Sequence, residues 1–339
     1  MSRLLVTTVG PATSVQDAGR YGAQRYGLTP SGAMDRLSLA IANCLVGNPL
    51  FAAAIEIGPL GASFTARDGA VRVALAGAAR GSRIGDHDAT PYQSHLLAEG
   101  ESLTLGAARD GVFSYLAIEG GVQGEQMFGS LAVNARAGLG SPYPRPLQGG
   151  DAIETLAAST APEHAILLPA PVQGPIRVIL GPQDDEFDRD AIAAFLDSEW
   201  KISGTSDRMG YRLEGGLEVR HLHGHNIVSD GTVNGSIQVP GNGQPIVLMP
   251  DRGTSGGYPK IATVISADIG RFAQIPAGRG LRFRAVGMSE AQAAARDMAK
   301  LLEGLPSRLR RPTDSSFDVD ALQSANVAGS AISAFDVPT

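Results

Sequence analysis

The sequence predicts a mainly β protein, a β-rich α+β fold in which helices lie around barrels or sandwiches. The chain has 43 glycines and 21 prolines among 339 residues and only 18% charged residues, a composition typical of many short strands joined by tight turns. Apolar runs rich in β-branched residues recur along it. The expected helices fall between these runs without regular strand–helix alternation, which argues against a doubly wound parallel sheet.

The strand candidates are short apolar runs bounded by turn residues, because a strand buried on one or both faces needs alternating or continuous apolar side chains. An N-terminal run that ends at Gly10 and Pro11 is expected to be the first strand rather than a secretory signal. The other runs occupy residues 71–75, 112–118, 176–180, 246–249, 261–265 and 281–286.

Three helices are expected, each with a recognisable start. Asp35 is placed to cap a helix that ends at Gly47, and Asp188 is placed to cap a shorter one. Ser289, with a glutamine three residues later, forms a capping box for a third helix, which we expect to end at Gly304.

The length and pattern indicate two domains. We predict an N-terminal β-rich domain over residues 1–165 and a C-terminal β-rich domain over residues 175–305, joined through a Pro-rich linker at 161–175. From residue 306 the periodicity is lost, so residues 306–339 are expected to be a flexible tail.

The composition excludes several classes of function. A net charge of −6 gives no electrostatic reason to bind nucleic acid or an anionic membrane surface. No stretch approaches the ~20 apolar residues of a membrane-spanning helix. Cys44 is the single cysteine and lies on an apolar helical pattern, so we expect a buried, unreactive thiol. These features fit a cytoplasmic protein.

Familiar nucleotide and hydrolase signatures are missing from the sequence, which has neither a Gly-x-x-x-x-Gly-Lys-Ser/Thr loop nor a Gly-x-Ser-x-Gly elbow. His221, His223 and His225 alternate, so on a strand they would share one face and could converge on a metal. An exposed strand end or turn explains the same cluster. Because no carboxylate pattern supports them, we expect no metal site.

The segment 206–215 concentrates charge among few apolar residues. Arg208 and Arg212 can clamp a carboxylate or phosphate in bidentate fashion, and Asp207 can hold one of them or act as a general base. A salt-bridged turn that enters a strand accounts for the same residues equally well.

The segment 235–260 is the stronger candidate. Gln238 and Gln244 offer amide donors and acceptors to a planar amide or ureido substrate. The glycine backbone at 254–257 can approach a ligand and direct N–H groups at a developing oxyanion. Lys260, one of only three lysines in the chain, ends this loop, where its charge can stabilise an anion. A Gly-rich hairpin without function remains the alternative.

Two N-terminal segments, 14–20 and 31–36, are similar but weaker. Asp35 already has a structural role as a helix cap, and Asp17 with Arg20 can simply pair in a turn. We predict catalytic roles for Asp207, Arg208, Asp251 and Lys260, and substrate-binding roles for Arg212, Gln238, Gln244, Arg252, Thr254, Gly256, Gly257, Tyr258, Asp17 and Ser31.

These segments together resemble the family of the biotin-dependent carboxyltransferase domain, which includes the C-type subunit of 5-oxoprolinase, allophanate hydrolase subunit 2 and Kip-type antagonist proteins. The resemblance spans residues 4–290, nearly the whole chain, and rests on the motifs at 15–20, 31–36, 206–215, 237–240 and 251–262. One departure is visible: Gly253 stands where the family usually has glutamine, which leaves the substrate open.

The resemblance implies two cyclophilin-like β-barrel domains and chemistry on an amide or ureido group. The implied function is that of the C-type subunit in an ATP-dependent 5-oxoprolinase, which hydrolyses the lactam of 5-oxoproline to glutamate with a B-type subunit (allophanate hydrolase subunit 1-like) and an A-type lactam-utilisation subunit. ATP is then required by the complex and is not bound by a motif in this chain, which we expect to be inactive or weak alone.

Two alternatives remain open. One is a biotin-dependent carboxyltransferase acting on urea or allophanate-type amides. Covalent biotin on this chain is not expected, because none of Lys201, Lys260 and Lys300 has the flanking methionines of a biotin carrier. The other is a Kip-type, non-catalytic regulator that binds a B-subunit-like partner.

Overall fold

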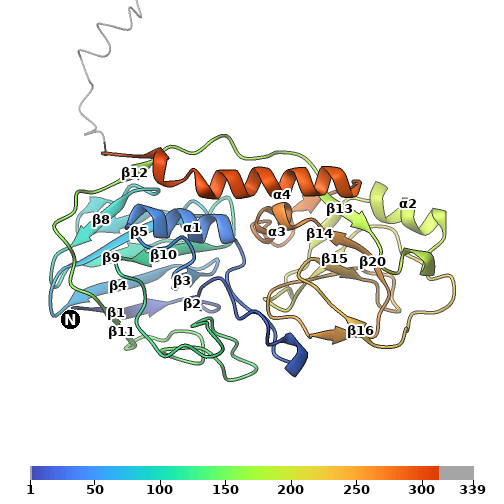
Figure 1. Cartoon of the computed structure of the whole chain (residues 1–339), viewed down its shortest axis with the longest axis horizontal. Helices are drawn as coiled ribbons and strands as arrows, with labels where there is room; N and C mark the ends of the chain where they lie inside the picture. The colour runs from blue at the N-terminus through green and yellow to red at the C-terminus, as the bar shows by residue number, and fades with distance from the viewer. Residues whose placement is uncertain (1, 313–339) are drawn as a thin grey trace, which may run out of the picture.

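The computed structural model describes residues 2–312, which form two β-rich lobes side by side, with helices on their outer faces (Figure 1). The strands up to residue 155 build one lobe and those from residue 176 to 285 build the other. The long helix α4 (Met288–Glu303) lies along the top of both lobes in Figure 1. The mainly β fold is therefore confirmed.

The N-terminal lobe contains two antiparallel sheets with one apolar core that draws side chains from both. The six-stranded sheet has the order β11 (Ala152–Thr155), β1 (Ser2–Val9), β4 (Ala62–Arg67), β9 (Ser102–Leu105), β6 (Ser82–Ile84) and β7 (His87–Asp88). The five-stranded sheet has the order β2 (Ser14–Gln16), β3 (Ala54–Ile57), β10 (Ser114–Ile118), β5 (Val71–Gly77) and β8 (Ser94–Leu97).

The C-terminal lobe is one eight-stranded sheet that curls into a nearly closed barrel. Its order is β21 (Gly280–Leu281), β14 (Trp200–Ile202), β15 (Gly210–Glu214), β18 (Ile246–Leu248), β17 (Ser236–Gln238), β20 (Lys260–Val264), β13 (Ile176–Leu180) and β22 (Phe283–Ala285). The two outermost strands, β21 and β22, are separated in the chain by Arg282 alone. The two edges of the sheet must therefore lie close together.

The expected helix starts are confirmed at two of three places. The Asp35 carboxylate accepts hydrogen bonds from the first turn of α1 (Arg36–Leu45), and that of Asp188 does the same for α2 (Arg189–Asp197). The capping box at Ser289 was wrong, because α4 begins earlier, at Met288, with Gly287 as its cap. It ends before Gly304, as expected.

One short helix, α3 (Ile269–Ala273), was not predicted from the sequence. It follows a 3-10 turn, η3 (Ser266–Asp268), and is too short to show an apolar period. Cys44 lies buried on α1, and burial raises the pKa of its thiol, as expected for an unreactive cysteine.

All the predicted strands exist, with small shifts at their ends. The run 281–286 differs from the prediction, because it forms two strands, β21 and β22, on either side of Arg282 and not one. Sequence periodicity marks an apolar run but not the point at which the chain changes its partner strand.

The segment predicted as tail begins with ordered structure. Residues 306–310 form a 3-10 turn, η4 (Pro306–Arg308), and a strand, β23 (Leu309–Arg310). β23 pairs with β12 (Ala165–Ile166), which lies inside the predicted linker. The expectation of a flexible tail from residue 306 was therefore wrong for these residues, and its remainder, 313–339, lies outside the described residues.

A second apolar core joins the two lobes. It unites residues of α1, such as Leu39 and Ile41, with residues of the C-terminal barrel, such as Phe272 and Val178, and with Leu305 after α4. The barrel core thus continues into the α1 side of the N-terminal lobe, whereas the core between the two N-terminal sheets is built from residues 4–153 alone.

Candidate functional site

Arg208 stands at the boundary between the lobes, with hydrogen bonds to both. Its Nε donates to Asp251 Oδ2 over 2.9 Å, and its Nη2 donates to Asp251 Oδ1 over 3.2 Å and to the Gly32 carbonyl oxygen over 2.7 Å. Its Nη1 forms an ion pair with Glu56. The structure therefore brings together Arg208 and Asp251, as the sequence suggested, but every nitrogen of this guanidinium already has a partner within the protein.

Glu56, on β3, is a partner of Arg208 that the sequence did not suggest. Its side chain is fully buried. Its Oε2 accepts hydrogen bonds from the backbone N–H of Met34 (2.8 Å) and from the Tyr115 hydroxyl (2.6 Å). The Tyr115 hydroxyl oxygen in turn accepts from the N–H of Asp35 over 2.7 Å. This network fixes the loop before α1 against the C-terminal lobe.

Electrostatics keep the Arg208 charge in place. Burial alone would lower the pKa of Arg208, but the carboxylates of Asp251 and Glu56 outweigh that effect and raise it. Burial raises the pKa of Tyr115 well above its usual value, and the nearby Glu56 adds to this. Tyr115 therefore acts as a neutral hydrogen-bond donor.

Asp207 shapes the turn that presents Arg208. Its Oδ1 accepts hydrogen bonds from the N–H groups of Met209 (2.8 Å) and Gly210 (3.3 Å), the pattern of an Asx turn. Its side chain is exposed, and its Oδ2 lies 3.4 Å from Nη2 of Arg136. Arg212, exposed on β15, and Gln244, half-buried after a turn, lie apart from this network.

Lys260, at the start of β20, is almost fully buried, with 1% of its side chain exposed. Its Nζ lies 3.0 Å from Oδ2 of Asp230, which is 53% exposed. Gln183 donates to the same oxygen over 3.0 Å. The Lys260 hydrogen bond, aided by those from Gly231 and Gln183, lowers the pKa of Asp230. The ammonium is thus held between the barrel interior and the surface.

The glycine-rich loop lies beside Lys260, as the sequence suggested. Gly256 belongs to β19 (Ser255–Gly256), which pairs with β16 (Asp230–Gly231) at the lower edge of the C-terminal lobe in Figure 1. A Cβ on Gly256 would lie 2.4 Å from Nε2 of Gln238, so a side chain at this position would have to displace the Gln238 amide. Gln238 also donates to the Tyr258 carbonyl oxygen over 3.4 Å, and the Tyr258 side chain is partly exposed.

Arg252 and Thr254 connect the Asp251 network with this ribbon. Arg252 is buried, and its Nη2 reaches the Thr232 carbonyl oxygen over 3.4 Å. Thr232 in turn donates from its N–H to the Thr254 carbonyl oxygen over 3.1 Å. Burial lowers the pKa of the Arg252 guanidinium, and the nearby Tyr21 hydroxyl partly offsets this lowering.

The two N-terminal candidates have structural partners. Asp17 accepts from the N–H of Gly19 and from the Ser130 hydroxyl, both over 2.7 Å, and so organises a buried turn. Ser31 receives a hydrogen bond from Nδ2 of Asn134 over 3.1 Å, and its own N–H donates to the Pro250 carbonyl oxygen over 3.2 Å. Ser31 therefore touches the loop that carries Asp251, whereas Asp17 supports the turn behind it.

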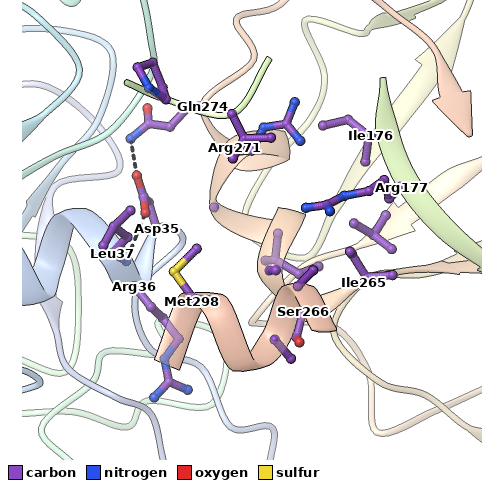
Figure 2. A pocket seen from close by; sticks show the side chains of 18 of the residues that line it. Asp35, Arg36, Leu37, Ile176, Arg177, Ile265, Ser266, Arg271, Gln274 and Met298 are labelled. Atoms are coloured by element: carbon purple, nitrogen blue, oxygen red, sulfur yellow. Dashed lines mark hydrogen bonds between the residues drawn. The ribbon is translucent and has the colours of Figure 1, made fainter. Parts of the chain in front are cut away.

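A cleft of about 1850 Å³ opens between the lobes beneath α4. Figure 2 shows Asp35, Leu37 and Gln274 together on one side, with the hydrogen bond between Gln274 and Asp35, and Ile176, Arg177 and Ile265 on the other side. Of the predicted site residues, Ser31 alone lines it. Lys260, Gly256 and Gly257 are not among the residues that line it, so we treat the cleft and the loop that carries Lys260 as separate candidate sites.

Sequence reasoning missed Glu56, Tyr115, Asp230 and Gln274. Gln274 bridges the lobes, since its Oε1 accepts from the N–H of Phe113 and its Nε2 donates to Asp35 Oδ2, over 2.9 and 3.0 Å. The sequence does contain a sign that Glu56 matters, because it is the single charged residue in the apolar strand Ala54–Ile57. A lone carboxylate in such a strand must find a buried partner.

Within the histidine cluster, His221 packs against the barrel. A ring nitrogen of His221 lies 2.9 Å from the Val239 carbonyl oxygen, and its ring packs on Phe187 at 5.3 Å between centroids. Within residues 2–312, no three His, Cys, Asp or Glu side chains are grouped as metal ligands. In the same residues, no helix has the length and apolar character needed to cross a bilayer.

Comparison with known proteins identifies the family. Residues 26–285 match the model of the carboxyltransferase domain, subdomains A and B. The chain is 38% identical over 309 residues to the C-type subunit of 5-oxoprolinase from Escherichia coli strain K12, covering 90% of this chain and 98% of that protein. It is 34% identical over 287 residues to the corresponding 5-oxoprolinase subunit of Haemophilus influenzae, covering 84% and 92%.

The fold also has a close counterpart among solved structures. The crystal structure of Kluyveromyces lactis urea carboxylase superposes with a TM-score of 0.83 at 26% identity, over 92% of this chain. The chain spans only 30% of that larger protein. The family match covers most of the chain, and the resemblance seen in the sequence motifs is confirmed. This protein belongs to the carboxyltransferase domain family with subdomains A and B.

Proposed function

We propose that this chain is the C-type subunit of an ATP-dependent 5-oxoprolinase, which works with separate A- and B-type subunits to open 5-oxoproline to glutamate. The observation that carries the proposal is the end-to-end match with a free-standing subunit. The chain accounts for 98% of the E. coli 5-oxoprolinase subunit but for 30% of the urea carboxylase. A relative matched over its whole length has the same domain content, whereas the urea carboxylase has additional parts.

The reaction requires the C–N bond of the lactam to break while water supplies oxygen to the carbonyl carbon. Negative charge develops on the lactam oxygen, and preorganised donors lower its energy. Lys260 and the backbone N–H groups of Gly256 and Gly257 are our candidates for these donors. Four hydrogen bonds within the protein already engage all three nitrogens of Arg208, so we assign it and Asp251 to positioning the loop rather than to contact with substrate.

ATP supplies the driving force for this lactam hydrolysis, and we place its site on one of the partner proteins. Phosphates prefer the free N–H groups at a helix N-terminus. In α1 and α2 those groups already bond to the carboxylates of Asp35 and Asp188, which would repel a phosphate. These two helix ends therefore do not fit a triphosphate.

Reconstitution tests the proposal. The purified chain alone should release no glutamate from 5-oxoproline, and addition of the A- and B-type subunits with ATP should restore turnover. Omission of this chain from the reconstituted mixture should abolish it. ATP-dependent glutamate release by the isolated chain, or full activity of the A- and B-type subunits without it, would contradict the assignment.

A carboxyltransferase acting on urea or a related amide is the second candidate, and the similarity to the urea carboxylase fold favours it. The two functions differ in their requirement for biotin. Avidin should leave 5-oxoprolinase activity unchanged but should abolish a biotin-dependent transfer of bicarbonate carbon to urea. Avidin-sensitive carboxylation of urea by the complex would establish this second function.

A further inference from the structure

Asp230 is an exposed carboxylate that lies directly against the buried ammonium of Lys260. Its side chain is 53% exposed, whereas that of Lys260 is 1% exposed, and its Oδ2 lies 3.0 Å from the Lys260 Nζ. Asp230 is therefore the member of this ion pair that a small molecule from solution reaches most readily. The sequence did not suggest it as a site residue.

The Asp230 carboxylate is held in one orientation by three donors. Besides the Lys260 ammonium, Nε2 of Gln183 donates to Oδ2 over 3.0 Å, and the N–H of Gly231 donates to Oδ1 over 2.7 Å. Gln183 is itself fixed, because its N–H donates to the Lys260 carbonyl oxygen over 3.1 Å and its Oε1 accepts the Lys260 N–H over 3.2 Å. A carboxylate offers about four lone-pair sites, so these three donors leave it able to accept a further hydrogen bond from the solvent side.

The same donors keep the carboxylate ionised. The hydrogen bond from Lys260 lowers the pKa of Asp230 most, and those from Gly231 and Gln183 lower it further. An ionised carboxylate accepts hydrogen bonds and donates none, so it attracts an N–H group and repels another oxygen atom. At neutral pH the side chain of Asp230 is thus a fixed acceptor.

Asp230 lies across the two-stranded ribbon from the glycine-rich loop. In the pairing of β16 with β19, Asp230 is opposite Gly256. A Cβ built on the next residue, Gly257, would lie 3.7 Å from Oγ of Ser229, so the two segments are in contact there as well. Ser229 is exposed, and Val228 before it is 91% exposed. The acceptor therefore borders the loop whose N–H groups are our candidate oxyanion donors, on a surface that is open to a ligand.

A five-membered lactam presents a donor and an acceptor side by side. The ring holds its amide in the cis form, so the N–H and the C=O lie on one edge of the molecule. An open-chain secondary amide is almost always trans and directs the two groups to opposite sides. A fixed acceptor beside backbone donors therefore matches the edge of a lactam.

We propose that Asp230 accepts a hydrogen bond from the ring N–H of 5-oxoproline, while the ribbon beside it faces the lactam oxygen. This inference rests on the proposed function and names the residue that recognises the amide nitrogen of its substrate. Gln183 acts through Asp230, as a positioning residue that holds the carboxylate in place.

The test compares 5-oxoproline with its lactone analogue, 5-oxotetrahydrofuran-2-carboxylate, in the reconstituted complex. The lactone has a ring oxygen in place of the N–H group, so it removes the donor with little change in shape. The ratio of the lactone Ki to the 5-oxoproline KM should fall by about 10- to 100-fold in Asp230→Ala, the range expected for a hydrogen bond to a charged group. Asp230→Asn should also lower this ratio, because its amide can donate to the ring oxygen of the lactone.

Asp68→Asn is the matched control. Asp68 is 49% exposed and forms an ion pair with Arg3 on the N-terminal lobe, so it resembles Asp230 in exposure and pairing but lies on the other lobe. Its variant should leave the ratio unchanged. Gln183→Leu removes one support of the carboxylate and should lower the ratio by less than Asp230→Ala does.

An unchanged ratio in Asp230→Ala and Asp230→Asn, with a lower Tm or a lower kcat alone, would show a structural role and overturn the proposal. If Asp230→Ala does not fold because Lys260 is then buried without a counter-charge, Asp230→Asn decides, since it keeps an acceptor for Lys260. A wild-type complex that does not turn over 5-oxoproline would refute the proposed function, and the role of Asp230 towards that substrate with it. An active wild type with an unchanged ratio in the variants refutes the role of Asp230 alone.

Discussion

At the scale of single residues, the most consequential contact is the three-way arrangement of Arg208, Glu56 and Asp251. The Glu56 side chain is 0% exposed, so only the Arg208 guanidinium beside it can stabilise a negative charge on this carboxyl group. A residue that the sequence suggests as catalytic can thus be engaged entirely in joining two lobes. We therefore predict that Arg208 affects function through the position of the 249–254 loop, which its bonds to Asp251 hold.

We expect Arg208→Met to destabilise the protein by about 3–5 kcal/mol, because the change leaves the Glu56 carboxylate buried without a counter-charge. Glu56→Gln in the same chain should recover part of that loss, since the buried charge is then removed. The free energy of unfolding from urea titrations of the two single variants and the double variant measures this coupling. Strictly additive losses would show that the pair is not energetically coupled.

Lys260 is the residue whose catalytic role is most directly testable. Lys260→Met should lower kcat/KM of the reconstituted complex about a hundredfold, the scale of one lost oxyanion donor. Lys260→Arg should recover little, because a larger guanidinium has no room at a position that is 1% exposed. Asp230→Asn is the control for the ion pair itself. If Lys260→Met keeps its kcat/KM and only lowers Tm, the lysine is structural.

At the scale of elements, α3 is attached to the barrel through a buried charge cluster. Asp268 accepts from the N–H, Nε and Nη2 of Arg177 on β13, over 2.9, 3.0 and 2.7 Å, and lies 3.1 Å from Nη1 of Arg271 on α3. Burial alone would raise the pKa of Asp268, but the arginine hydrogen bonds and charges outweigh it and lower the pKa.

This shift predicts an acid-sensitive contribution to stability. A carboxyl with a depressed folded-state pKa stabilises the protein fully above its unfolded pKa of about 3.9 and loses that contribution as the pH falls towards the folded value. Asp268→Asn should therefore cost about 3–5 kcal/mol at pH 7, and the difference from wild type should shrink below about pH 4. Unfolding curves at pH 7, 5 and 3.5 measure it. A difference that does not change with pH would contradict the ion-pair explanation.

At the scale of the whole molecule, the two lobes share a core. α1 covers the five-stranded sheet of the N-terminal lobe, and its buried residues, with Leu39 and Ile41 among them, belong to the same apolar cluster as the barrel residues. Figure 1 shows α4 lying over α1 and reaching the barrel. The apolar face of α1 and the sheet side beneath it are therefore buried in one cluster with the barrel, in addition to the core that the two N-terminal sheets form by themselves.

We therefore expect one cooperative unfolding transition for the chain rather than two. A fragment of residues 1–165 should expose the outer face of α1 and aggregate or remain partly unfolded. Calorimetry of the full chain, with the ratio of calorimetric to van't Hoff enthalpy near one, checks the first part. Two resolved transitions would show that the lobes are independent folding units.

The sequence by itself determined the local structure of this protein. Each predicted strand depends on an apolar run within a few residues, and the caps Asp35 and Asp188 bond to their own helices. The sequence also marked two candidate segments, because chemistry-bearing residues cluster at 206–215 and 235–260, and their catalytic role stays a prediction. Local pattern failed where the signal was short or ambiguous, as at α3 and at the start of α4.

Tertiary structure alone decided what these residues can do. Glu56 and Arg208 are 152 positions apart, and no local pattern announces that one neutralises the other. Arg20 and Arg252 have guanidinium nitrogens without a hydrogen-bond partner within residues 2–312, which is a result of packing and not of either segment. A side chain's chemistry depends on its remaining hydrogen-bonding capacity and its desolvation, and both are set by distant parts of the chain.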